Sequence, residues 1–149
     1  MAEINADKLE VSLRKRLKEA MRKNIIPGGA VAIYQHGKLV CHVIEGYRNL
    51  DTQEPITTET MFRLASMTKP YVPEGTPGLA ADQSWGLGVR VLRNHACLPD
   101  GCYGWSGAYG THFWVDPQND ITAVYLKNVR RIGLMTVHHI EIDVMSSLE

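Results

Sequence analysis

The apolar residues of this chain occur in short runs that turn-forming residues separate. The longest unbroken apolar run, Ala30 to Tyr34, has five residues, whereas a membrane-spanning helix needs about 18 or more. Short apolar runs between turns are typical of strands joined in hairpins. We therefore expect no membrane partner and a fold that contains several short strands.

The length and charge of the chain indicate a single globular domain and argue against a nucleic-acid-binding protein. A chain of 149 residues buries roughly 70% of its unfolded surface, so it needs neither a disulfide nor a metal to hold a core. We predict a single domain over residues 1–149. Lys and Arg number 16 against 16 Asp and Glu, so no basic field favours a nucleic-acid partner. The charged start lacks the apolar core of a secretion signal, which predicts a cytoplasmic protein for the chain as written.

Two segments carry apolar residues at helical spacing. In the segment from Ala6 to Asn24 they repeat every four positions, at Leu9, Leu13, Leu17 and Met21. This spacing predicts a surface helix that packs on a core through one stripe. The end of the chain fits either a strand, with Ile140, Ile142 and Val144 alternating, or a helix face of Val137, Ile140, Val144 and Leu148. Its length and terminal position favour the helix.

Three pairs of segments are typical of β-hairpins because a turn signal joins each pair. The pairs are 30–34 with 39–44, 85–92 with 103–107, and 111–115 with 121–126. Residues 70–84 contain three prolines and two glycines without periodicity, which predicts a connector. The order of elements predicts an α+β fold, in which N- and C-terminal helices flank an antiparallel sheet of about five strands.

The cysteines raise the question of a disulfide or a metal site. They are Cys41, Cys97 and Cys102. A small, odd number favours reduced thiols, although the turn between Cys97 and Cys102 leaves a disulfide open. Together with His95 these two cysteines offer three soft metal ligands, but no fourth ligand lies at a usual spacing for zinc. We therefore predict no metal site.

The remaining histidines are expected to be structural. His138 and His139 lie beside Glu141, but neighbouring residues on a helix point apart, so an exposed pair is favoured over a metal site. His112 lies on a predicted strand, where a packed or rim histidine is the default.

The segment Ser66-Met67-Thr68-Lys69 has the Ser-x-x-Lys spacing, which brings a hydroxyl and an amine to one face of a helix. A serine alone is a poor nucleophile, and a neutral lysine one turn away can accept its proton. Threonines at positions 57, 58 and 60 predict a helix that starts near Met61 or a few residues later. The four-residue pattern is weak by itself, because chance also produces it.

Two longer segments resemble a known family. Phe62–Pro70 resembles the nucleophile segment of the serine hydrolases that include class C β-lactamases, low-molecular-mass penicillin-binding proteins and related esterases. Gly104–Thr111, with residues 112–117 after it, resembles the family's third motif, which lies on the strand that lines the active-site cleft. The preceding helix, the first hairpin and the strand that begins at Trp85 follow in the family's order. The resemblance covers roughly residues 5–127.

This resemblance implies a set of site residues. Ser66 would be the acylated nucleophile and Lys69 its proton acceptor, and the backbone N–H groups of Ser66 and Ala108 would form an oxyanion hole. The residues implied along the substrate edge are Trp105, Ser106, Gly107 and Tyr109. The implied chemistry is acyl transfer from a small-molecule ester or β-lactam through a covalent acyl-enzyme, with no cofactor.

The chain departs from the family between these two motifs. Family members carry a large, mostly helical region there, with a Tyr-x-Asn motif, whereas here only the connector 70–84 precedes the strand at Trp85. Tyr47-Arg48-Asn49 has the right spacing but precedes the nucleophile, so we interpret it as coincidence. The tyrosines that remain as alternatives are Tyr71, Tyr103 and Tyr109, each more typical of packing.

Two functions follow from these observations. The first is a small serine hydrolase with weak activity through Ser66 and Lys69. The second is a non-catalytic α/β scaffold that keeps the motif residues. Loss of a packed helical region exposes a face that the chain must cover with its connector or by association, so a homodimer is one of two possible outcomes.

Overall fold

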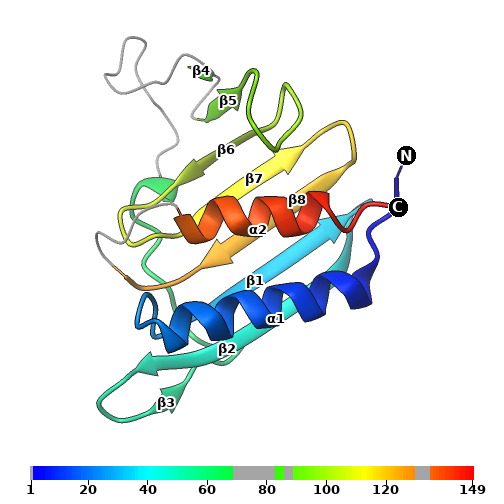
Figure 1. The fold of residues 1–149 in the computed structure, drawn as a ribbon. Coiled ribbons are helices and arrows are strands. Elements are labelled where there is room, and N and C mark those ends of the chain that lie inside the picture. Colours follow the sequence, from blue (N-terminus) through cyan, green and yellow to red (C-terminus); the bar gives the residue numbers. More distant parts are fainter. Residues whose placement is uncertain (1, 69–82, 86–88, 130–134) are drawn as a thin grey trace.

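The computed structural model describes residues 2–68, 83–85, 89–129 and 135–149. Its elements in chain order are α1 (Ala6–Arg22), β1 (Gly28–Gln35), β2 (Lys38–Asn49), β3 (Glu54–Pro55), the 3-10 helix η1 (Ala65–Thr68), β4 (Gln83–Trp85), β5 (Arg90–Leu92), β6 (Tyr103–Ser106), β7 (His112–Asp116), β8 (Ile121–Leu126) and α2 (Met135–Met145). The strands form one antiparallel sheet in the order β3-β2-β1-β8-β7-β6-β5-β4 (Figure 1). The α+β class is confirmed, with eight described strands where we expected about five.

Helix α1 confirms the prediction from the leucine spacing. The Asn5 side chain caps the helix by accepting a hydrogen bond from the Lys8 N–H at 3.0 Å. Leu9, Leu13 and Leu17 have no exposed surface, because the stripe that they form faces the sheet. The helix thus packs on the core as expected.

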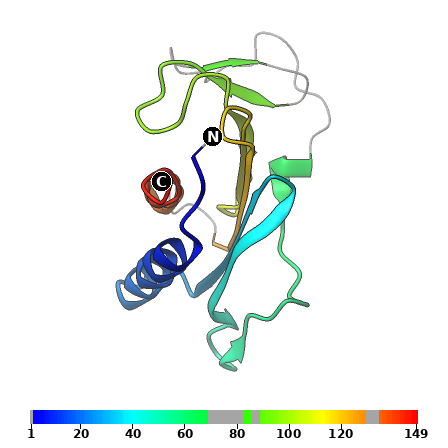
Figure 2. The ribbon, with the colours of Figure 1, turned by 90° about the vertical axis from the view of Figure 1, so that its right-hand side faces the viewer.

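The C-terminal segment is a helix, as its length favoured. Helices α1 and α2 lie side by side on one face of the sheet (Figures 1 and 2). Val137, Ile140 and Val144 of α2 are buried in the core. Arg16 of α1 donates two hydrogen bonds to the Asp143 carboxylate of α2, at 2.7 and 2.9 Å. This charged pair joins the two ends of the chain.

Two of the predicted hairpins are the β1–β2 and β7–β8 pairs, and the third is present in part, since β5 pairs with β6. Strand β1 pairs with β2 on one side and with β8 on the other. The N-terminal hairpin therefore lies beside the last strand, and the sheet is continuous from both halves of the chain. Of the helices within the described residues, none is long and apolar enough to cross a membrane.

One expectation about local structure was wrong, and the helix expected near Met61 or a few residues later is present only as the short η1, which begins at Ala65. We expected one strand over residues 85–92, but Trp85 of β4 and Arg90 of β5 are antiparallel partners, so the chain reverses between them. The glycines at 86 and 88 weaken a continuous strand, since glycine has no side chain to pack in a sheet. Residues 61–64 are irregular, and the described helical turn is the short η1. Thr57 and Thr60 instead close a turn with each other, since the Thr57 N–H donates to the Thr60 hydroxyl at 2.9 Å. The remainder of the predicted connector, residues 70–82, lies outside the described residues.

Candidate functional site

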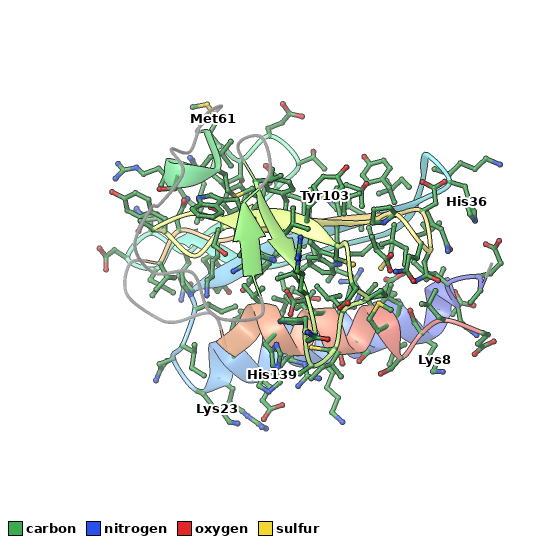
Figure 3. The ribbon with its side chains drawn as sticks, turned by 90° about the horizontal axis from the view of Figure 1, so that it is seen from above. Lys8, Lys23, His36, Met61, Tyr103 and His139 are labelled. Atoms are coloured by element: carbon green, nitrogen blue, oxygen red, sulfur yellow. The ribbon has the colours of Figure 1, made fainter. Side chains whose placement is uncertain are left out.

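Ser66 lies in η1, on the face of the sheet opposite to the helices. Figure 2 shows η1 on one side of the sheet and both α-helices on the other. In Figure 3, Met61 and His139 mark these two sides. Ala65 has a φ of 50°, a left-handed conformation that is uncommon for a residue with a side chain. The backbone therefore turns sharply just before the serine.

The segment that leads to Ser66 is anchored to the turn between β6 and β7. The Thr111 hydroxyl donates a hydrogen bond to the Leu64 carbonyl oxygen at 3.1 Å. The Arg63 N–H donates to the Asn128 side chain at 3.0 Å, and the Arg63 guanidinium lies 5.6 Å from the centre of the Tyr109 ring. These contacts bring the two family-like segments together, although about 40 residues separate them in sequence.

Gly107 permits this close approach. A Cβ atom at this position would lie 2.2 Å from the Leu64 carbonyl oxygen and 2.3 Å from the Thr111 hydroxyl oxygen. Any side chain would therefore push the Ser66 segment away from the sheet. Within the turn, the Gly107 N–H donates to the Thr111 carbonyl at 2.8 Å and the Gly110 N–H donates to the Gly107 carbonyl at 2.9 Å. This tight turn leaves Ala108 exposed and Tyr109 half-buried.

The residues expected along the substrate edge point to two different faces. Trp105 pairs with Phe113 and Ser106 pairs with His112, and directly opposed residues share a face of the sheet. Ser106 therefore lies with His112 on the helix side, where its hydroxyl contacts His112 Nδ1 at 2.8 Å. Trp105 lies on the face that carries η1. Lys69 and Tyr71 are outside the described residues.

Ser106, His112 and Glu141 form a chain of polar contacts beneath α2. His112 Nε2 lies 3.4 Å from Glu141 Oε1. Burial lowers the pKa of His112, which favours its neutral ring, and the ring has Ser106 at Nδ1 and Glu141 at Nε2. Burial opposes ionisation of Glu141, but its interactions with His112, His95 and His138 together outweigh burial and leave its pKa lowered. A serine, a histidine and a carboxylate are thus in line, but His112 is only 1% exposed.

A second cluster of polar side chains lies on the helix side and was not among the predicted sites. His95 and Cys97, in the loop between β5 and β6, meet His138 and Glu141 of α2, and one ligand atom from each lies within 4.8 Å of the others. The three cysteines are free thiols. Cys102 does not join the cluster: it is fully buried, and burial together with Asp116 raises its pKa to about 12. Spacing patterns for metal ligands gave no signal for this cluster, because Cys97 and His138 are 41 residues apart in the sequence.

A cavity of about 310 Å³ lies near the C-terminal end of α1. It is lined by Met21, Asn24, Ile25, Ile26, Pro27, Tyr47, Leu50 and Val129. None of the predicted site residues is among them. The cavity therefore does not mark the candidate acyl-transfer site.

Several known proteins resemble this chain in sequence or in fold. The sequence model of the beta-lactamase family matches residues 13–73, a stretch that includes Ser66 and Lys69. The esterase EstB of Burkholderia gladioli is 28% identical over 90 residues, which are 60% of this chain and 23% of EstB. Protein Rv1367c of Mycobacterium tuberculosis is 34% identical over 90 residues, which are 60% of this chain and 21% of that protein.

The fold has a close structural counterpart. EstCE1, described as a hydrolase with promiscuous acyltransferase activity, superposes with a TM-score of 0.82 at 12% identity, covering 94% of this chain and 99% of that one. The chain is thus similar to the beta-lactamase family in sequence over residues 13–73, and it shares the fold of EstCE1. It spans about a quarter or less of the length of the two sequence relatives.

Proposed function

We propose that this chain transfers acyl groups from small-molecule esters through Ser66, with Lys69 as the proton acceptor. Ser66 Oγ attacks the ester carbonyl carbon while its proton passes to the neutral Lys69 amine. The tetrahedral oxyanion then collapses, and the alcohol leaves with the proton that the lysine returns. Water hydrolyses the resulting acyl-enzyme by the same proton transfers. The N–H groups of Ser66 and Ala108 hold the oxyanion.

The observation that carries this proposal is the anchoring of the Ser66 segment on the Gly107 turn. Thr111 holds the Leu64 carbonyl at 3.1 Å, and Gly107 leaves no room between the two segments. The nucleophile segment and the turn that would supply the second oxyanion donor are therefore adjacent. Positioning of this kind is a large part of the rate enhancement in acyl transfer.

Apolar side chains beside Ser66 support an ester with an apolar acyl group. Met61 is 91% exposed and Leu64 is 37% exposed, and both precede the serine by a few residues. An apolar acyl chain that covers them removes apolar surface from water. We expect p-nitrophenyl butyrate to react faster than p-nitrophenyl acetate for this reason.

The test is to find which serine carries the acyl group. The 149-residue chain is incubated with p-nitrophenyl butyrate or a reporter penicillin, and the adduct is located by intact mass and peptide mapping. We expect the label on Ser66, no label in Ser66→Ala and full labelling in Ser146→Ala, whose exposed serine lies at the end of α2. A label on Ser106, or equal background in wild type and Ser66→Ala, would overturn the proposal.

A second variant separates the lysine from the serine. Lys69→Ala removes the proposed proton acceptor and leaves the nucleophile in place, so we expect acylation to fall by at least a hundredfold. Circular dichroism should show an unchanged fold. Labelling at the wild-type rate in Lys69→Ala would mean that another base accepts the proton.

A further inference from the structure

Four potential metal ligands converge where the loop between β5 and β6 crosses α2. Figure 2 shows this loop, residues 93–102, extending to the helix side of the sheet. His95 and Cys97 come from the loop, and His138 and Glu141 come from α2. In Figure 3 the labelled His139, next along the helix, marks this side of the molecule. The cluster is thus separated by the sheet from Ser66.

The distances among these ligand atoms suit a tetrahedral metal ion. Cys97 Sγ lies 3.5 Å from His138 Nδ1 and 3.9 Å from His95 Nδ1, and His138 Nδ1 lies 3.3 Å from Glu141 Oε2. Zinc bonds of about 2.3 Å to sulfur and about 2.0–2.1 Å to nitrogen or oxygen place tetrahedral ligands roughly 3.3–3.6 Å apart. The ligand atoms all lie within 4.8 Å of one another, so rotations of the His95, Cys97 and His138 side chains that move these atoms by a fraction of an ångström to about 1 Å would close the set around one ion.

The charges at the cluster also favour a divalent cation. Glu141 is 4% exposed, so its carboxylate lies largely out of water. Its carboxylate faces His112 at 3.4 Å and His138 at 3.3 Å. A buried carboxylate without a full positive charge beside it is costly. A divalent ion bound to this carboxylate, one thiolate and two neutral imidazoles has its charge balanced.

A second layer of contacts holds the carboxylate in position. Glu141 directs Oε2 at the cluster, while Oε1 faces His112 Nε2 at 3.4 Å. His112 is in turn held by Ser106 at 2.8 Å. Ligands of protein metal sites are commonly oriented in this way by partners behind them. The cluster is thereby connected to strands β6 and β7.

One set of existing contacts must give way. His95 Nδ1 accepts from the backbone N–H groups of Cys97 at 3.5 Å and Leu98 at 3.3 Å. Both are long for N–H···O or N–H···N hydrogen bonds, so their loss costs little against a bond to a metal.

We propose that His95, Cys97, His138 and Glu141 bind one divalent transition-metal ion, with zinc as the best fit. Cys97 loses its thiol proton to solvent as the sulfur bonds to the ion, and the two histidines bind it through a ring-nitrogen lone pair. The ion would fasten the 93–102 loop to α2, so it stabilises the fold, and the site is independent of acyl transfer at Ser66. The presence of a thiolate and two imidazoles favours zinc over magnesium or calcium.

The test measures metal binding directly. Tag-free chain is stripped with chelator and titrated with Zn²⁺ against a chromophoric competitor, and Co²⁺ is added separately to record the thiolate-to-cobalt charge-transfer band. We expect one equivalent of Zn²⁺, a cobalt spectrum of tetrahedral type, and a rise in Tm with Zn²⁺. Cys97→Ala and His138→Ala should each weaken binding by at least a hundredfold and abolish the rise in Tm.

Two control variants change a histidine and a cysteine that lie outside the proposed metal site. His139→Ala removes the adjacent exposed histidine of α2, and Cys41→Ala removes a buried thiol far along the sheet, so both should bind Zn²⁺ as the wild type does. Circular dichroism of each metal-free variant establishes that it is folded. Folded wild type that binds no Zn²⁺ at 100-fold molar excess, or Cys97→Ala and His138→Ala that bind it unchanged, would overturn the proposal.

Discussion

The hydroxyl of Thr111 donates a hydrogen bond to the carbonyl oxygen of Leu64 across 3.1 Å, and so joins two segments 47 residues apart. Leu64 lies two residues before Ser66. Thr111 follows the Gly107–Gly110 turn and is fully buried. One side chain of the sheet therefore sets how close the nucleophile segment lies to that turn.

Thr111→Val should loosen this segment while preserving the size of the side chain. A hydrogen bond of this kind contributes about 1 kcal/mol to the free energy of unfolding, and the substitution leaves the Leu64 carbonyl oxygen without this donor. We expect a similar loss in the free energy of unfolding and at least a tenfold fall in the rate of Ser66 acylation. Urea unfolding and acylation kinetics measure these effects. Thr122→Val, at a half-buried position of β8, is the control and should acylate normally.

Gly107→Ala tests the close approach of the Leu64 carbonyl to the turn by changing the residue on the turn. The new Cβ would lie 2.2 Å from the Leu64 carbonyl oxygen, so the segment must shift, at a cost of about 1–3 kcal/mol. We expect acylation of Ser66 to be lost. Gly37→Ala is the matched control: Gly37 has a φ of +69° but no atom within 4 Å of its Cβ position, so its strain should lower stability and leave acylation unchanged. Equal acylation in both variants would contradict the anchoring argument.

Local patterns were sufficient to predict the elements that rest on repeated apolar positions. The fourfold spacing of Leu9, Leu13 and Leu17 is the stripe that α1 buries. The turn at residues 35–38 and the turn at 116–120 join the strands expected from the sequence. These features depend on neighbours in sequence, so the amphipathic period and the turn residues define them.

Features that depend on pairing register or distant contacts could not be predicted. The face on which Ser106 lies follows from its pairing with His112, and a shift of one residue would reverse it. The cluster of His95 and Cys97 with His138 exists only because the loop crosses α2. No spacing rule joins residues that are about 40 positions apart, which is why we expected no metal site.

The ion pair between Arg16 and Asp143 should be the main polar contact between the two helices. Asp143 is 8% exposed and receives two hydrogen bonds from the guanidinium. Asp143→Ala should lower the free energy of unfolding by about 1.5–3 kcal/mol, since hydrogen bonds to a charged group are lost in a half-buried site. The exposed pair Lys23–Glu19 provides the control, because Lys23→Ala should have little effect.

A double-mutant cycle distinguishes this pair from a general effect of the helix contact. Arg16→Ala, Asp143→Ala and the double variant are unfolded in urea at pH 7. If the pair itself stabilises the fold, the double variant should lose little more than either single variant. Fully additive losses would show that the two side chains act separately.

Stability should fall at alkaline pH because two thiols are buried. Burial is the main cause that raises the pKa of Cys41 to about 11 and that of Cys102 to about 12, from a value of 9.0. Above pH 9 the unfolded chain releases these protons while the folded chain retains them. The unfolded state then binds fewer protons, so stability is complete below pH 9 and declines as pH rises toward 11 or 12.

The size of this decline can be isolated with Cys102→Ala. Each retained thiol proton lowers the free energy of unfolding by up to about 1.4 kcal/mol per pH unit. Cys102→Ala is expected to be less stable at pH 8, because a buried group is lost, yet its stability should fall less between pH 9 and pH 11. Urea unfolding at pH 8, 9, 10 and 11 gives both slopes. All other side chains are the same in both proteins, so the difference between the two slopes belongs to Cys102. If the wild-type and Cys102→Ala stability curves were parallel, Cys102 would ionise as easily in the folded state as in the unfolded state.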